Sequence, residues 1–307
     1  TTNSTTTGNG SVYIYSLEGV GGGWDQMGSD LSGAEANDKA GWSVSLNASG
    51  DKVAYGIPGK DTKAGGGAVY NFSGGIWNRM GEVITRTVGN DNDEMGWSVS
   101  LDSSGNTLAI GCPGGDSNGL VQVYNLSGTS WEQCGSDIKD ASGQNGDNFG
   151  WAVSLNGAGS KLAIGYPNKP IVDTHSTNTN NSILGGVTVY ENLSGDGSCN
   201  WVKTGVNENM TGYVDNDMIG YSVSLDEVGN TVAVGVPHIS DQVGFIRVYE
   251  FLNKPLGPDY VPDIVSHKKR IPDPDKNIFK FTKNVPQDYF VPNLEVEYIF
   301  LDNIERK

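Results

Sequence analysis

The sequence is poor in the residues that build catalytic and metal centres. Its 307 residues include only three histidines and three cysteines, and no two cysteines form a Cys-x-x-Cys pair. A cysteine-ligated zinc site and a thioredoxin-like redox site are therefore excluded. His175, His238 and His267 have no partner visible in the sequence. We interpret them as solvated loop residues.

Long apolar runs and positive charge are also scarce. No apolar stretch approaches the roughly 20 residues that span a bilayer, so we expect no membrane insertion. Thirty-six acidic against 20 basic residues give a net charge of −16. This charge disfavours nucleic acid and anionic membrane surfaces as partners, because both repel a polyanion.

Motifs for catalysis are missing as well. The sequence has no serine or cysteine nucleophile motif, no phosphate-binding loop and no metalloprotease motif. We therefore predict a protein that is not an enzyme, has no catalytic residues and requires no cofactor.

What the sequence does contain is an internal repeat. The string Gly-[Trp/Tyr]-[Ser/Ala]-Val-Ser-Leu begins at positions 41, 96, 150 and 220. A Gly-x-Pro follows each copy, and then a Val-Tyr pair that ends at Tyr70, Tyr124, Tyr190 or Tyr249. A fifth such strand ends at Tyr15, and the first four Val-Tyr strands each precede a Trp-x-x-x-Gly. Self-similarity at this period predicts a repeat architecture.

Hydrophobic residues within each repeat alternate with a period of two, which is typical of β-strands. In the first copy Trp42, Val44 and Leu46 share one face, whereas Ser43 and Ser45 share the other. Each sheet therefore has a bulky face and a small face, and a bulky face can pack on the small face of the next sheet. This pattern predicts an all-β fold, a β-propeller of four-stranded antiparallel blades.

The motif Phe149-Gly150 with Ala152-Val153-Ser154-Leu155, followed by Leu162 to Pro167, resembles the FG-GAP repeat of integrin α-chain-type β-propellers. The resemblance recurs four times in register across about residues 11–251. Two departures are visible. The alanine of the family name never occurs in the Gly-x-Pro, and the first hairpin lacks the acidic loop that often binds calcium in that family. Similar repeats occur in surface proteins of marine microbes, algae and large viruses, which implies an extracellular, cell-surface or virion-surface location.

The strand count indicates an incomplete ring. The repeats supply two strands, then three complete units of four, then three strands, which makes seventeen. We predict that the natural protein continues upstream of Thr1 or that the chain is an excerpt, and an intact mass matching 307 residues would contradict this.

The composition changes after Phe251. Seven of the twelve prolines but only one glycine fall in residues 252–307. We divide the chain into propeller repeats (1–251), a proline-rich linker (252–276) and a C-terminal β extension or the start of another domain (277–307). Strands are expected at 277–282 and 294–301, beginning another domain or joining the sheet of a neighbouring molecule. The tail 252–307 is the segment expected to bind protein partners.

One carboxylate recurs three residues before the glycine of each inner strand, and further aspartates follow the Gly-x-Pro motifs. The loops that hold the two sets emerge on the same face of a propeller, so we predict an acidic rim. Its members are Asp38, Asp93, Asp147, Asp217, Asp61, Asp116, Asp173 and Asp241. One interpretation is that the first set accepts backbone N–H groups in Asx turns. The other is cation binding, in which Ca²⁺ is held by Asp91, Asp93, Asp215 and Asp217, where oxygen ligands alternate along the chain.

All seven tryptophans occupy two repeat positions. We interpret them as blade-packing residues, with sugar-stacking platforms as the alternative. The cysteines are interpreted as small buried hydrophobes, with a bridge between Cys134 and Cys199 as the alternative. Seven Asn-x-Ser/Thr sequons are glycosylation candidates, at Asn71, Asn125, Asn192, Asn47, Asn180, Asn209 and Asn3.

These observations together predict a non-enzymatic surface β-propeller for adhesion, recognition or structural assembly. The alternative is a carbohydrate-binding lectin or a glycoside-active enzyme that uses the acidic rim.

Overall fold

The fold is described by a computed structural model. It describes residues 8–18, 22–86, 91–141, 143–171, 182–194, 199–204, 210–211, 217–237, 244–252 and 296–302. The described elements are almost all β-strands. The exceptions are a helical turn, α1 (Lys60–Lys63), and one 3-10 turn (Gly115–Ser117), both in connections that follow a Gly-x-Pro.

Three complete sheets have four antiparallel strands each, in which neighbours along the chain are neighbours in the sheet. Their strands are β5 (Val44–Leu46), β6 (Lys52–Gly56), β7 (Gly67–Ser73) and β8 (Ile76–Arg79); β9 (Ser98–Leu101), β10 (Thr107–Cys112), β11 (Leu120–Ser127) and β12 (Ser130–Gln133); and β13 (Ala152–Leu155), β14 (Lys161–Tyr166), β17 (Gly186–Asn192) and β18 (Trp201–Thr204). The predicted four-stranded unit is confirmed.

The repeats at the two ends have fewer strands among the described residues, and continuation of the protein upstream of Thr1 stays a prediction. The first sheet there consists of β2 (Tyr15–Glu18) and β3 (Gly23–Gln26). The last has β19 (Ser222–Leu225), β20 (Thr231–Val236) and β21 (Phe245–Leu252). Two further sheets have two short strands each: β1 (Ser11–Val12) pairs with β4 (Leu31–Ser32), and β15 (Pro170–Ile171) pairs with β16 (Ser182–Ile183).

The strand expected near the C-terminus is present as β22 (Val296–Asp302). It pairs in parallel with β21 of the same chain, at the position where the complete sheets have an antiparallel outer strand. The strand expected at 277–282 lies outside the described residues, and so does the proposed linker. The division of residues 252–307 into linker and further domain stays a prediction.

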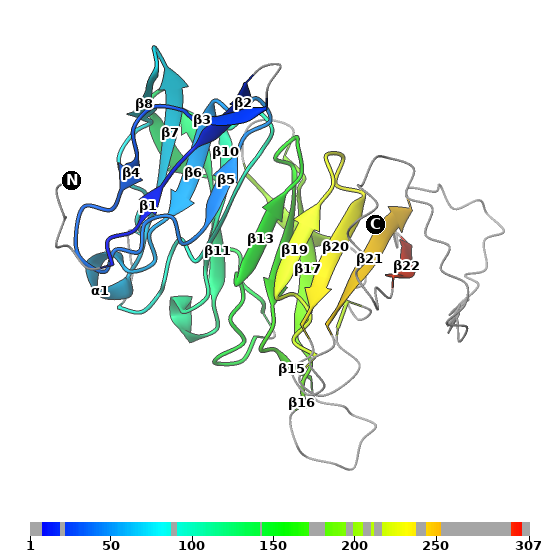
Figure 1. Ribbon diagram of the computed structural model, residues 1–307. Helices are drawn as coiled ribbons and strands as arrows, with labels where there is room; N and C mark the ends of the chain where they lie inside the picture. Colours follow the sequence, from blue (N-terminus) through cyan, green and yellow to red (C-terminus); the bar gives the residue numbers. More distant parts are fainter. Residues whose placement is uncertain are drawn as a thin grey trace.

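The sheets stand in a row, with the inner strands β5, β9, β13 and β19 next to one another (Figure 1). The first sheet lies at one end of the row and the last sheet at the other. The described part of the chain contains no helix long and apolar enough to cross a membrane.

The core lies between the sheets and follows the predicted alternation. Leu108 and Ile110 of the second complete sheet pack with Ala54 and Val69 of the sheet before it. The next two joints repeat this arrangement, with Ala109 against Leu162 and Ile164, and Ala163 against Val232 and Val234. Because one face of each strand pair is reduced to alanine, glycine and serine, neighbouring sheets approach closely and bury the bulky side chains of the next sheet.

Candidate binding surfaces

The first set of rim aspartates is buried. Asp38, Asp93, Asp147 and Asp217 are each 5% exposed or less. Asp38 Oδ2 accepts the N–H of Glu35 at 2.9 Å, and Asp147 Oδ2 accepts the N–H of Gln144 at 2.7 Å. These bonds reach back three residues and close the turn that leads into the inner strand. These two carboxylates thus accept backbone N–H groups, as the structural interpretation expects, but the donor lies three residues earlier and not two residues later as in an Asx turn.

Asp93 is held differently, by an ion pair with Arg86. The same guanidinium lies 3.3 Å from Asp116 and 3.6 Å from Asp137, and Lys139 also pairs with Asp116. Burial alone would lower the pKa of Arg86, but Asp93 and Asp116 raise it overall. The hydrogen bond from Lys139 lowers the pKa of Asp116. This part of the rim is therefore neutralised by its own cations.

The remaining rim residues are dispersed. Asp61 is exposed and pairs with Lys60, and Asp91 accepts the hydroxyl of Thr62. Asp215, Asp173 and Asp241 lie outside the described residues. Among the residues that are described, no group of three His, Cys, Asp or Glu side chains is arranged so that it could hold a metal ion. Calcium binding at Asp91 and Asp93 stays a prediction from the sequence.

Asp147 gives a test of these buried carboxylates. Its Oδ1 atom is buried and has no hydrogen-bond partner among the described residues. Burial raises the pKa of Asp147 above its ordinary value of 3.8. The Asp147 carboxyl therefore ionises at a lower pH in the unfolded chain than in the folded chain. At neutral pH, where it is ionised, this difference in pKa lowers the stability of the folded state. Asp147→Asn keeps an acceptor for Gln144 and cannot ionise.

We expect Asp147→Asn to melt at a higher temperature than the wild type at pH 7, with a difference that shrinks as the pH falls towards 3.8. Thermal melts followed by circular dichroism at pH 7, 5 and 4 measure this difference. A variant that is less stable at pH 7, or a gain that grows on acidification, would contradict the expectation.

The tryptophans at the start of the inner strands form a continuous ladder with Tyr221. Ring centroids are 4.8 Å apart from Trp42 to Trp97, 4.7 Å from Trp97 to Trp151 and 5.5 Å from Trp151 to Tyr221. Neighbouring rings are tilted by 48 to 51°. Each ring packs on the ring of the next sheet, which agrees with the blade-packing interpretation. The ends of the ladder remain open, since Trp42 is 50% and Tyr221 46% exposed.

Two outer-strand tryptophans also join neighbouring sheets. The indole N–H of Trp77 donates to the carbonyl of Met27 at 2.6 Å, and that of Trp131 to the carbonyl of Met80 at 3.0 Å. Sequence reasoning missed these bonds, although Trp-x-x-Met recurs in two consecutive repeats at Trp24 and Trp77. They couple the outer edges of consecutive sheets.

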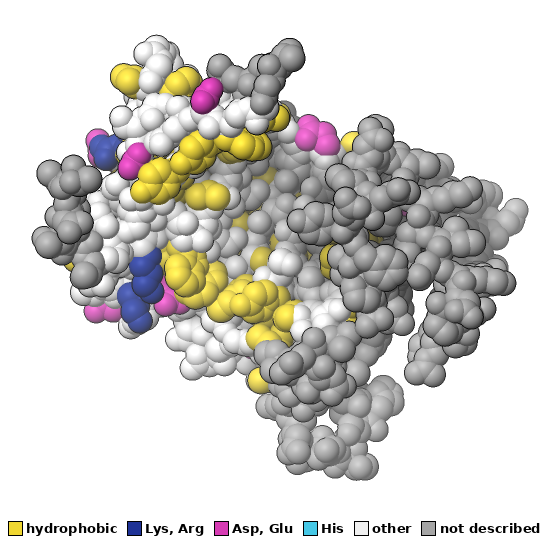
Figure 2. Space-filling model, in the orientation of Figure 1, with side chains coloured by type: hydrophobic (Ala, Val, Ile, Leu, Met, Phe, Trp, Pro, Cys, Tyr) yellow, Lys and Arg dark blue, Asp and Glu magenta, His cyan; other side chains and the backbone are white. Residues whose placement is uncertain are grey.

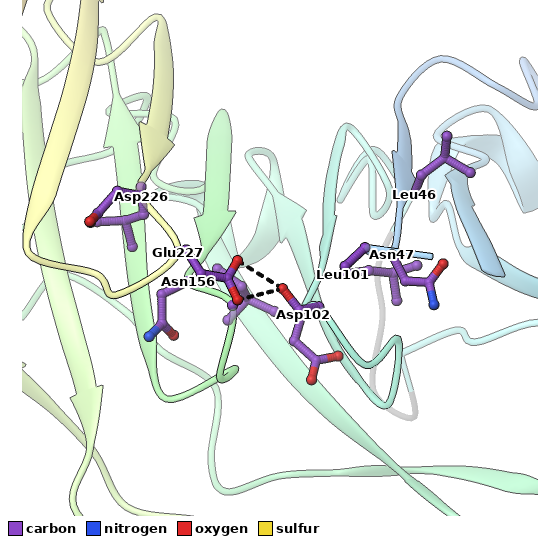
Figure 3. Close-up of a pocket in the computed structure, with 12 residues that line it drawn as sticks. Leu46, Asn47, Leu101, Asp102, Asn156, Asp226 and Glu227 are labelled. Atoms are coloured by element: carbon purple, nitrogen blue, oxygen red, sulfur yellow. Dashed lines mark hydrogen bonds between the residues drawn. The ribbon is translucent and has the colours of Figure 1, made fainter. Parts of the chain in front are cut away.

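The opposite ends of the inner strands surround a cavity of about 220 Å³. The four turns there are linked in series by backbone bonds: Ala48 N–H donates to Ser103, Ser103 N–H to Gly157, and Gly157 N–H to Glu227. Ser103 also donates its hydroxyl to both carboxylate oxygens of Glu227, at 3.0 and 2.9 Å (Figure 3).

Side chains that follow the inner strands line this cavity, namely Asn47, Asp102, Asn156 and Asp226. Asp102 Oδ1 accepts the N–H groups of Asn106 and Thr107, both at 2.8 Å. Asn47, Asn156 and Asp226 close their own hairpins in the same way. The recurrence of Leu-[Asn/Asp] in the repeats could have indicated this role, which is structural.

Large apolar side chains are exposed on the first sheet and on β5 (Figure 2). We call these seven residues the first-sheet surface: Tyr13, Tyr15, Leu17, Trp24, Trp42, Val44 and Leu46. Val44 is 57% and Leu46 52% exposed, whereas Val99 and Leu101, at the same positions of the next sheet, are each 7% exposed. The cause is that Val12, Ile14 and Leu31 pack with side chains of β6, β7 and β8, in a cluster that includes no residue of β5. Groups of exposed apolar side chains of this kind mark interaction surfaces.

Cys134 and Cys199 form a disulfide. The interpretation of these two cysteines as unpaired hydrophobes is therefore wrong, and the alternative bridge is present. The disulfide joins the outer strands of two neighbouring sheets. Between the preceding pairs of sheets, the corresponding link is the hydrogen bond from a tryptophan indole to a methionine carbonyl. Cys112 is unpaired and fully buried, as expected, and burial raises the pKa of its thiol.

The described sequons differ in how their amides are held. Asn71, Asn125 and Asn192 lie on β7, β11 and β17 and are partly buried. The amide nitrogen of Asn125 donates to the sulfur of Cys134 at 3.2 Å, and Asn47 is 7% exposed and bonded within its hairpin. Asn180, Asn209 and Asn3 lie outside the described residues. Glycosylation stays a prediction.

Comparison with known proteins supports the fold. No protein-family model and no curated protein matches the chain. A solved structure of a protein assigned as a 6-phosphogluconolactonase from Bacteroides uniformis is similar, with a TM-score of 0.51 and 11% identity over 79% of this chain and 61% of that chain. TolB from Acinetobacter baumannii gives a TM-score of 0.40 and 11% identity over 72% of this chain and 43% of that one.

Both neighbours are β-propellers, and the chain spans less than two thirds of the length of either. At 11% identity the likeness to the first shows the fold alone. The all-β composition, the four-stranded antiparallel sheets and this neighbour together show that the chain has the β-propeller fold.

Proposed function

We propose that the chain is a non-enzymatic β-propeller of FG-GAP-like repeats that works outside the cell or on a particle surface, in recognition or assembly. The first-sheet surface carries this proposal. Buried apolar side chains are the main source of affinity in protein association. Seven large ones gathered at one end of the row therefore suit a protein partner. The tail of residues 252–307 would supply a second attachment.

The disulfide supports the location. Disulfides persist in oxidising compartments and are rare where thiols are kept reduced. Cys134 and Cys199 are 65 residues apart and meet only because two sheets pack side by side. A secreted or surface-exposed chain accounts for this bond and for the acidic, glycine-rich loops.

A photo-crosslinking residue at Val44 tests the proposal. We expect the substituted chain, added to the extracellular fraction of cells that produce it naturally, to form covalent adducts with protein. The matched control is the same substitution at Val228, an isolated apolar side chain that is 63% exposed. Equal labelling from both positions, or labelling from neither, would contradict the proposal.

Carbohydrate binding is a second candidate, because the Trp42–Tyr221 ladder lies beside the rim and is half-exposed at both of its ends. A glycan array and a polysaccharide hydrolysis screen distinguish the candidates. Glycan binding that is lost in Trp42→Ala would favour the lectin, and turnover of a polysaccharide would overturn the non-enzymatic proposal.

A further inference from the structure

An outer joint, the contact between the outer strands of neighbouring sheets, has a recurring hydrogen bond. In the first two outer joints an indole N–H donates to the carbonyl of the residue three positions after the tryptophan of the sheet before. The bonds are those of Trp77 to Met27 and Trp131 to Met80. In the third outer joint the indole belongs to Trp201, and the residue three positions after Trp131 is Cys134. Within the described part of the chain, the Trp201 indole N–H is buried and has no hydrogen-bond partner.

The disulfide occupies the place that the indole takes in the other joints. Next to the accepting carbonyl each joint has a glycine, namely Gly28, Gly81 or Gly135. In the first two joints, the side-chain atom nearest to a Cβ added to this glycine is the indole Cδ1, at 3.0 and 3.4 Å. In the third joint it is the Cβ of Cys199, at 3.4 Å. The bridge to Cys134 therefore holds Cys199 where the ring of Trp201 would otherwise lie.

The backbone of the third joint is nevertheless arranged as in the other two. In every joint the residue two positions before the tryptophan turns its carbonyl towards the same glycine. The carbonyl oxygens of Gly75, Thr129 and Cys199 lie 3.5, 2.9 and 2.8 Å from the Cβ added to Gly28, Gly81 and Gly135 respectively. We therefore expect a movement of the Trp201 side chain, rather than a shift of the strands, to bring its N–H to the carbonyl of Cys134.

A cavity of about 240 Å³ lies beside both groups, and its wall includes Cys199 and Trp201. Thiol–disulfide exchange requires that an attacking thiolate reach one sulfur of the bridge. Cys134 is only 5% exposed, so Cys199 is the half of the bridge that a reductant can reach from this cavity. The cavity also gives the indole ring space to move while the core between the sheets stays closed.

We propose that the third outer joint is a redox switch with two mutually exclusive arrangements. In the oxidised form the disulfide links the sheets and the Trp201 N–H is unsatisfied. A dithiol reductant transfers two electrons and two protons to the bridge, which leaves two cysteine thiols and the disulfide form of the reductant. The released Cys199 side chain then makes way for the indole, which donates to the carbonyl of Cys134. The proposal does not depend on the proposed function.

The indole bond limits what reduction does to the fold. A buried donor without a partner carries a desolvation cost, and satisfying the Trp201 N–H removes it. The new bond therefore offsets part of the stability that is lost with the cross-link. We expect the reduced joint to stay closed at its outer edge, in the arrangement of the two joints that never had a disulfide.

Nuclear magnetic resonance of the full chain labelled with ¹⁵N-tryptophan tests the switch. The indole resonances are assigned by their absence from Trp201→Phe and, as the matched control, from Trp131→Phe. On addition of dithiothreitol we expect the Trp201 indole proton to move downfield towards that of Trp131, which stays in place. Its exchange with solvent should slow about fivefold, the factor for one net hydrogen bond. The double variant Cys134→Ala with Cys199→Ala should show the downfield resonance without reductant.

Urea unfolding of the two tryptophan variants gives a second readout. In the oxidised chain Trp201→Phe should lower the unfolding midpoint less than Trp131→Phe does, because the Trp201 indole has no bond to lose. In dithiothreitol the two variants should lower it equally.

Each other result overturns the proposal. A Trp201 resonance at one position in both redox states would show that the indole does not respond to the bridge. Loss of the dispersed indole resonances on reduction would show that the disulfide alone holds the joint. Thiol titration that finds no new thiols in the folded chain after dithiothreitol would show that Cys199 is out of reach of a reductant.

Discussion

Replacing Gly111 with alanine is expected to lower the free energy of unfolding by about 3 kcal/mol, the upper part of the usual range for overpacking. Gly111 lies on β10, and its φ angle is outside the left-handed region. The cost therefore comes from contact rather than from backbone conformation. The added methyl group would lie 2.0 Å from the carbonyl oxygen of Gly150. The methyl group is fixed to the backbone of β10 and the oxygen is a backbone atom of the turn before β13, so the two sheets must separate and loosen the core between them.

Gly23→Ala is the matched control. Gly23 lies at the start of β3, has no positive φ angle and has no heavy atom within 4 Å of an added Cβ. A surface change of this kind alters stability by at most about 0.5 kcal/mol. Urea denaturation followed by tryptophan fluorescence measures both variants. Equal midpoints for Gly111→Ala and Gly23→Ala would contradict the close approach of the two sheets.

The repeated parts of the sequence predicted the fold because they report local geometry. Alternation in Gly-Trp-Ser-Val-Ser-Leu assigns each side chain to one face of a strand, and the structure places Val99 and Leu101 in the core while Ser98 and Ser100 contact the next sheet. Four copies of one pattern also remove the ambiguity that a single short strand carries. The number of strands in each sheet, their antiparallel pairing and the side chains that form the core could therefore be predicted from the sequence.

Residues that occur in only one repeat could not be predicted. Arg86 forms ion pairs with Asp93, Asp116 and Asp137, but the matching position of the next repeat holds Asp140, which pairs instead with Lys169. The partners come from loops that differ between repeats, and sequence spacing does not place such loops side by side. The acidic rim was therefore visible in the sequence, whereas its neutralising cations were not.

On the first-sheet surface, the sequence pattern predicts burial where the structure shows exposure. The sequence predicts that Trp42, Val44 and Leu46 share a bulky face, and the rule that bulky packs on small predicts their burial. They are exposed because no inner hairpin among the described residues lies against them. Periodicity identifies a face, but only the arrangement of sheets shows whether that face is covered.

Removal of the disulfide is expected to have the largest effect on stability. The bond closes a loop between residues 65 positions apart. Opening it restores chain entropy to the unfolded state, which corresponds to about 4 kcal/mol for a loop of this length. We therefore expect the double variant Cys134→Ala with Cys199→Ala to unfold at a lower urea concentration than the oxidised wild type.

The redox dependence separates this effect from a loss of packing. In the presence of dithiothreitol the wild type has the open loop but keeps both sulfur atoms, so most of the difference between wild type and double variant should disappear. Cys112 stays reduced and buried under both conditions and does not contribute. A wild type whose unfolding midpoint is the same with and without dithiothreitol would show that the cross-link does not stabilise the joint. The outer edges of these two sheets would then be held by contacts such as that of the Asn125 amide with the Cys199 sulfur at 3.7 Å and the packing of Trp201 on the core.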